Sequence, residues 1–343
     1  DEKKPAFNIK KIYADAYQQE SSAGGELYPA VNEAINNAVE TGTLFLDYFG
    51  HGGVNGWAAE RILEIPQIQN WNNVNNLPLF ITVTCEFTRF DNPSRLSAGE
   101  YTMWNARGGT SHLISTTREI FIREGNDFNR NLILNLLSAE EEDYSISEVL
   151  MYTKHQSFSS QRFFVYSFGD PAMKLALPKP SINLTKMNGI EISKSRDTLK
   201  ALSKIKFEGI IADQNGQLIN DFNGSMSATI YDKPLDKITL DNDQLGKTME
   251  FTAIESKIFS GRASVDNGEF SFEFIVPKDI RIAYGNAKIS LYADNIISDR
   301  NGSDPSIIIG GLNPDAPSDS QGPEIKLFMN DESFVDGGNT SSS

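Results

Sequence analysis

The sequence is poor in the residues from which many protein sites are built. It has 343 residues with one cysteine, Cys85, and three histidines, His51, His112 and His155. A single cysteine excludes a disulfide within the chain and any zinc site that needs several cysteines. No run approaches the ~18 consecutive apolar residues that a transmembrane helix requires.

Basic residues are also scarce, with 31 Lys and Arg against 46 Asp and Glu and a formal net charge of −15. This balance excludes nucleic acid as an expected partner, because phosphate binding needs clustered Lys and Arg. The opening residues, DEKKPAFN, start without Met and lack the basic-then-apolar layout of a signal peptide. We therefore expect an excised piece of a longer protein, with its first domain incomplete at the N-terminus.

Residues 1–178 alternate apolar strands with helical stretches. Apolar residues recur at four-residue spacing in YPAVNEAINNAVETG (28–42), which predicts a helix. Strands are predicted at LFLDYF (44–49), LPLFITVT (77–84) and SHLIST (111–116). Further strands are expected at 9–17 and within 162–177, and further helices at 93–109, 118–137 and 146–160. This order predicts an α/β domain with a mostly parallel sheet flanked by helices.

The pattern changes at LPKPS (177–181), where two prolines interrupt regular structure. Beyond this point apolar and polar residues alternate, and Asn-Gly turns at 213–217 and 266–269 favour hairpins. We predict an antiparallel β-sandwich over 179–343, with IKLFMND (325–331) as its last strand.

The chemistry-bearing residues lie at two predicted strand ends. Strand 44–49 runs into Gly-His51-Gly52-Gly, and strand 77–84 ends at Cys85. In an open parallel sheet, ligands bind beyond the carboxyl ends of the strands. If the two strands are neighbours, Cys85 would attack a carbonyl as nucleophile and His51 would transfer the proton. The amides of Gly52 and Cys85 would then serve as oxyanion donors. The alternative is an ordinary loop histidine and a buried, inert cysteine.

Several stretches resemble gingipain-type cysteine peptidases, namely YFGHGG, TCEF and GDPAMKL. Longer stretches in both halves are similar to the cell-surface sortases of the type IX secretion system of Bacteroidetes, namely DAYQQ, GHGGVNGW, TCEFTRFDNPSRLSAGE, FNGSMSATIYDKP and VPKDI. The resemblance implies a caspase-like α/β fold, with His51 as base and Cys85 as nucleophile.

The same resemblance implies where such a protein acts and on what. It implies an exported peptidase at the cell surface, associated with the outer membrane and with other components of the secretion system. The expected substrates are the C-terminal sorting domains of secreted cargo proteins. Surface lipopolysaccharide is the expected acceptor of the cargo.

Some site residues are weaker candidates. Gingipain-type peptidases orient the histidine with an upstream carboxylate, for which Asp15 is the best local candidate; a turn or cap is the alternative. Trp57 and Glu86 are candidates for the substrate pocket, against a packing aromatic and a salt-bridge residue. Thioester chemistry requires no cofactor, and no catalytic metal is expected. The resemblance also implies structural calcium, for which Asp91 is considered against a simple turn.

Two other functions stay open at this point. The chain could be an inactive peptidase-like scaffold that binds cargo or secretion partners, which a missing orienting carboxylate would favour. It could also be a structural surface protein, as the acidic composition and the β half would suit. We expect His112 and His155 to be structural or solvated.

Overall fold

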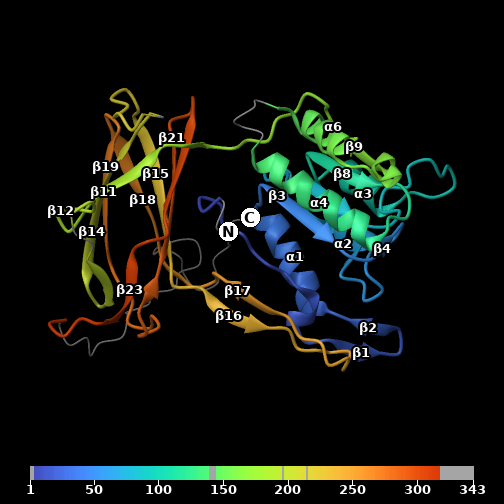
Figure 1. The fold of residues 1–343 in the computed structure, drawn as a ribbon, viewed down its shortest axis with the longest axis horizontal. Helices are drawn as coiled ribbons and strands as arrows, with labels where there is room; N and C mark the ends of the chain where they lie inside the picture. Colours follow the sequence, from blue (N-terminus) through green and yellow to red (C-terminus); the bar gives the residue numbers. More distant parts are fainter. Residues whose placement is uncertain (1–3, 139–143, 195–196, 214, 317–343) are drawn as a thin grey trace, which may run out of the picture.

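The computed structural model describes residues 4–138, 144–194, 197–213 and 215–316. Figure 1 shows an α/β half and a β-rich half joined by an extended segment. Within the described residues, no helix is long and apolar enough to cross a membrane.

The first half is built on a four-stranded sheet in the order β3-β7-β8-β9. Strands β3 (Phe45–Phe49), β7 (Leu79–Val83) and β8 (His112–Thr116) are parallel, and β9 (Val165–Phe168) is antiparallel to β8. The predicted α/β fold with a mostly parallel sheet is therefore confirmed.

Helices cover both faces of this sheet. One face packs against α1 (Pro29–Thr41), α2 (Ile65–Asn70) and α3 (Ala98–Trp104), and the other against α4 (Ile122–Leu137) and α6 (Ile146–Gln156). All five residues of β7 are buried, because alternate side chains face the two helical layers. Phe80 lies in the core under α1–α3, and Ile81 lies in the core under α4 and α6.

Two helix ends show what the residue pattern can and cannot predict. Helix α1 stops at Gly42, which has a φ of 98°, a conformation that favours glycine. Helix α3 begins at Ala98, later than the Pro93 expected. The cause is a capping box, in which the backbone N–H and the hydroxyl of Ser97 both donate to the Glu100 carboxylate at 2.8 and 2.7 Å.

The strand expected at 9–17 is wrong. This segment contains only a short 3₁₀ helix, η1 (Ala14–Ala16). Its apolar residues Ile12 and Tyr17 pack against the core of the first half, so they are partly buried without a partner strand.

Several short elements had not been predicted. They are β1 (Glu20–Ser22), β2 (Gly25–Leu27), β4 (Gly52–Gly53), β5 (Gly56–Trp57), β6 (Leu63–Glu64) and η2 (Ser160–Phe164).

The second half is a β-rich and mostly antiparallel domain, as predicted. Its main sheet has nine strands in the order β10-β22-β21-β15-β18-β19-β14-β11-β12. Their bounds are β10 (Lys179–Pro180), β11 (Ile182–Met187), β12 (Ile190–Glu191), β14 (Lys204–Ile211), β15 (Gly224–Tyr231), β18 (Lys257–Asp266), β19 (Glu269–Ile275), β21 (Lys288–Asp294) and β22 (Asp299–Asp304). The sheet curls around its own core until β11 contacts β22.

A smaller sheet completes this half, formed by β13 (Thr198–Ala201), β23 (Ile308–Leu312) and β20 (Gly285–Asn286). The predicted Asn-Gly turn joins β18 to β19, where Asn267 and Gly268 have φ values of 52° and 79°. Positive φ at both positions is typical of a type I′ hairpin. The strand expected at 325–331 lies outside the described residues.

A hairpin of the second half reaches back to the first. We call β16 (Leu235–Ile238), β17 (Glu250–Ala253) and their connection the arm, which extends under α1 in Figure 1. The Nζ of Lys11 donates to the carbonyl of Thr252 at 2.8 Å, and the rings of Tyr13 and Phe251 pack edge to face at 4.9 Å. The arm therefore connects segments more than 200 residues apart in the sequence.

Candidate functional site

The strands that carry the predicted pair are adjacent and parallel. Phe49 at the end of β3 is paired with Val83 at the end of β7. Since His51 and Cys85 each follow two residues later, both emerge at the carboxyl edge of the sheet. This is the edge where α/β folds of this kind bind ligands.

The two side chains share this edge without a direct hydrogen bond. His51 is exposed and Cys85 is half-buried. The Cys85 Sγ lies 4.0 Å from the carbonyl oxygen of Ile120. Within the described ranges, the His51 imidazole hydrogen-bonds to no side chain. Catalytic hydrogen bonds are often long before substrate binds, so this geometry suits an unliganded site.

Two backbone N–H groups at this edge are available to a ligand. Among the described residues, the N–H of Cys85 has no acceptor. Gly52 lies opposite Trp57 in the β4–β5 pair, while Ala58 N–H donates to the His51 carbonyl at 2.8 Å. In this register Gly52 and Trp57 are opposite each other but exchange no backbone hydrogen bonds. The N–H of Gly52 therefore points away from β5. Both predicted oxyanion donors are therefore unused by the fold.

Glycine is required at position 52. A Cβ there would lie 2.7 Å from the Thr84 Oγ1 and 2.9 Å from its Cγ2. The loop after β3 can therefore approach the end of β7 only because residue 52 has no side chain.

Asp15 does not orient His51, which corrects the role expected for it. Its carboxylate accepts hydrogen bonds from the backbone N–H groups of Asp241 (3.0 Å) and Asn242 (2.9 Å), and from the Asn242 side chain at 2.9 Å. Burial is the largest single influence on the pKa of Asp15 and raises it, but the hydrogen bonds together leave the pKa below its ordinary value. Asp15 thus secures the arm rather than the catalytic edge.

Trp57 is a packing residue, which corrects the pocket role considered for it. Its side chain is 2% exposed and is stacked on Tyr48 with ring centroids 4.1 Å apart. Its indole N–H donates to the Thr82 Oγ1 at 3.1 Å. The ring therefore supports the loop from below and faces no open pocket.

The acidic residues near Cys85 are engaged in ion pairs. Glu86 pairs with Arg89 at 2.9 Å and has a φ of 50°, in the left-handed region. The carboxylate of Asp91 accepts two hydrogen bonds from Arg118, one of them 3.1 Å long. In the described part of the chain, no group of three or more His, Cys, Asp or Glu is placed to hold a metal. Calcium at Asp91 stays a prediction.

The other two histidines lie away from the candidate pair. His155 is exposed near the end of α6. His112 is fully buried at the start of β8, and its Nε2 lies 2.6 Å from the Ser167 Oγ. Burial lowers the pKa of His112, against a smaller opposing influence of Asp170. Folding therefore favours the neutral imidazole.

Stability should fall as the pH drops below about 6.5, the ordinary histidine pKa. The unfolded chain takes up the His112 proton in that range, while the folded protein resists until the pH reaches its lower pKa. Urea denaturation at a series of pH values measures this slope. His112→Gln should flatten the slope, and His155→Gln, at an exposed site, should leave it intact. Equal slopes in wild type and His112→Gln would contradict the prediction.

Sequence reasoning missed the hydroxyl groups at the catalytic edge. Thr84 Oγ1 donates to the Gly50 carbonyl at 2.6 Å, and the Tyr48 hydroxyl donates to the His51 carbonyl at 2.6 Å. The Oγ1 of Thr116 hydrogen-bonds to the backbone of Thr84. The signal was present in LPLFITVT, where polar threonines stand near the end of a run that is otherwise apolar.

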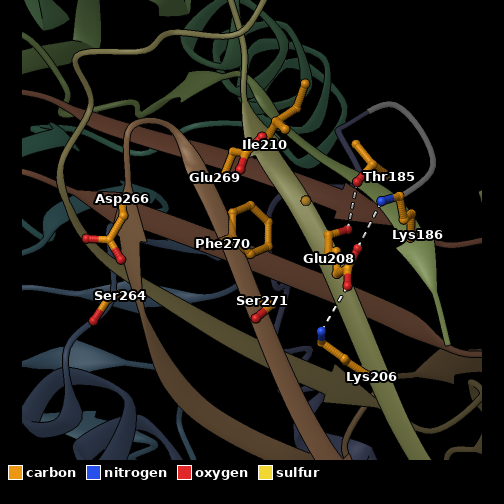
Figure 2. Close-up of a pocket in the computed structure, with 11 residues that line it drawn as sticks. Thr185, Lys186, Lys206, Glu208, Ile210, Ser264, Asp266, Glu269, Phe270 and Ser271 are labelled. Carbon is orange, nitrogen blue, oxygen red and sulfur yellow. Dashed lines mark hydrogen bonds and ion pairs between the residues drawn. The ribbon is translucent and has the colours of Figure 1, made fainter. Parts of the chain in front are cut away.

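The outer face of the second half has a groove of about 590 Å³, which differs in its chemistry from the edge that carries His51 and Cys85 (Figure 2). Glu208 lies between Lys186 and Lys206 and pairs with them at 3.3 and 2.9 Å. The negative charge of Glu208 is thus compensated by the two lysines, and Phe270 in the groove is 5% exposed. The groove is typical of the solvated face of a sheet and includes no nucleophile and base.

No curated protein matches the chain. Among solved structures, it is similar to dimeric latent PorU from Porphyromonas gingivalis, with 23% identity, a TM-score of 0.40, and coverage of 67% of this chain and 22% of PorU. It is also similar to the complex of RgpB pro- and mature domains from the same organism, with 16% identity, a TM-score of 0.36, and coverage of 79% and 57%.

The chain thus spans about a fifth of the length of PorU and just over half of RgpB. Peptidase family C25 matches residues 1–176, the part that contains both His51 and Cys85. This match supports the resemblance to gingipain-type peptidases. The chain belongs to peptidase family C25.

Proposed function

We propose that this chain carries the active site of a cysteine endopeptidase that acts through a thioester on Cys85. The observation that carries the proposal is the shared edge of β3 and β7, where His51 and Cys85 emerge beside two unused backbone N–H groups. A nucleophile, a base and oxyanion donors are the parts that acyl transfer requires.

The reaction begins when the Cys85 sulfur attacks the carbonyl carbon of the scissile peptide bond and His51 accepts the thiol proton. The oxyanion that forms is stabilised by the N–H groups of Gly52 and Cys85. His51 then protonates the leaving amine, and the thioester remains on Cys85. Water, or an amine at the cell surface, attacks the thioester and restores the thiol.

We further propose that the substrates are the C-terminal sorting domains of secreted cargo, removed at the cell surface next to outer-membrane components of a type IX secretion system. Lipopolysaccharide would then be the acceptor in a transfer reaction. The motifs around His51 and Cys85, and FNGSMSATIYDKP in the β half, support this assignment. A cleaved cargo tail with a new bond to an amine acceptor would be its direct evidence.

The test of the active site is the pH dependence of Cys85 alkylation by iodoacetamide. Because the chain has one cysteine, the whole signal reports on this thiol. A cysteine activated by a neighbouring histidine should react with a pKa below the ~8.5 of a free thiol. Free cysteine in the same buffers is the control. A free-thiol profile, together with no cleavage of cargo tails, would overturn the peptidase proposal.

The second candidate function is an inactive scaffold that binds cargo or secretion partners. One observation favours it: within the described residues no carboxylate hydrogen-bonds to the His51 ring. This candidate predicts an ordinary Cys85 profile and cargo binding that survives Cys85→Ala. A structural surface protein likewise predicts that Cys85→Ala leaves its role intact, but without cargo binding.

A further inference from the structure

Three hydroxyl side chains connect the strand ends at the catalytic edge. We call Tyr48, Thr84 and Thr116 the edge hydroxyls. Thr84 lies directly before Cys85, yet its Oγ1 donates to the carbonyl of Gly50, which directly precedes His51. This 2.6 Å bond therefore joins the residues next to the nucleophile and next to the base.

The other two edge hydroxyls fix the same unit. Tyr48 donates to the carbonyl of His51 at 2.6 Å, and its ring is held by stacking on Trp57. Thr116 hydrogen-bonds to the backbone of Thr84 and ties it to β8. The carbonyl groups of Gly50, His51 and Thr84 thus each accept a hydrogen bond from the fold, while within the described residues the N–H groups of Gly52 and Cys85 stay unused.

The Thr84 bond is partly buried, since Thr84 is 1% exposed and Gly50 is exposed. Without the hydroxyl, water could hydrate the Gly50 carbonyl, but the carbonyl would lose its link to Thr84. A β-branched side chain also has few rotamers, which keeps Oγ1 directed at its acceptor. The close approach of Gly52 to Thr84 adds a steric limit, since any side chain at residue 52 would meet the threonine.

We propose that Thr84, assisted by Tyr48, is a positioning residue that holds the His51 loop at a fixed distance from Cys85. This inference rests on the proposed peptidase function. Reactive geometry is sensitive to displacements of about 1 Å, which can cost on the order of 100-fold in rate. One partly buried hydrogen bond between the two strand ends controls a displacement of that size.

The two residues should contribute unequally. In the described part of the chain, the Gly50 carbonyl has no hydrogen-bond donor besides Thr84. The His51 carbonyl has a second donor, the N–H of Ala58 at 2.8 Å. We therefore expect removal of the Thr84 hydroxyl to displace the loop more than removal of the Tyr48 hydroxyl.

The test compares Thr84→Val, which keeps the shape and removes the hydroxyl, with Thr84→Ser, which keeps the hydroxyl. The readout is the pH profile of Cys85 alkylation. In Thr84→Val alkylation near pH 6.5 should slow by about tenfold or more, toward the rate of free cysteine, because a displaced imidazole accepts the thiol proton less well. Thr84→Ser should retain the wild-type profile, and Tyr48→Phe should fall between the two.

A matched control separates positioning from stability. Thr153 on α6 is also fully buried, and its Oγ1 donates to the Val149 carbonyl at 2.8 Å. Thr153→Val should lower the melting temperature without changing the alkylation profile. If wild type is alkylated like free cysteine and cleaves no cargo tails, both proposals are overturned together. If wild type reacts faster than free cysteine and Thr84→Val reacts equally fast, the positioning role alone is overturned.

Discussion

His51→Ala is expected to slow Cys85 alkylation at about pH 6.5 and also the cleavage of cargo tails. Cleavage should slow by roughly 10²–10⁴-fold, which is the usual contribution of a general base. Without the imidazole the proposed acceptor of the thiol proton is missing, so alkylation near neutral pH should slow. His51 is exposed, and for this reason the variant should fold normally. The loss would then report on chemistry alone.

The matched variant is His155→Ala, which removes an exposed histidine from α6. It should leave both rates unchanged. Alkylation profiles that coincide for wild type and His51→Ala would show that the imidazole has no influence on the sulfur. In that case the shared edge of β3 and β7 would be a feature of the fold without a catalytic function.

The second large effect concerns stability. Trp57→Ala should destabilise the first half by about 3–5 kcal/mol, the usual cost of truncating a buried aromatic residue to alanine. Its ring stacks on Tyr48, packs near Phe80 and Phe87, and donates to Thr82. Chemical denaturation followed by circular dichroism and intrinsic fluorescence measures the change.

Trp104→Ala is the control, because Trp104 is 64% exposed. Its effect should stay within about 0.5 kcal/mol. The two halves have separate hydrophobic cores, so Trp57→Ala should lower the transition of the first half and leave most of the β half intact. A change as small as that of Trp104→Ala would contradict the packing described for Trp57.

The sequence predicted those parts of the fold that depend on local pattern. Helix α1 followed from apolar residues at four-residue spacing and a terminal Gly42, and β7 followed from a continuous apolar run. The position of His51 and Cys85 at one edge also followed, because parallel strands present their carboxyl ends together. The first two features are set by neighbours in the chain, and the third needs only that β3 and β7 pair in parallel.

Features that depend on contacts between residues far apart in the chain could not be predicted from local sequence pattern. The 9–17 segment has the composition of a strand but has no partner strand, and Asp15 is used by residues 241–242 far along the chain. The sequence does not distinguish a Trp57 that lines a pocket from one that packs on Tyr48, as the structure shows. The role of Thr84 required the register of β3 against β7, which no periodicity in either strand reveals.

The arm has a consequence for the order in which the protein forms. Lys11 and Asp15 hydrogen-bond to residues 240–252, which a ribosome makes after the whole α/β half. Closing so long a loop is slow relative to local helix formation. During synthesis these contacts must therefore wait until residue 252 has been made, so docking of the arm on the first half is a late step of folding.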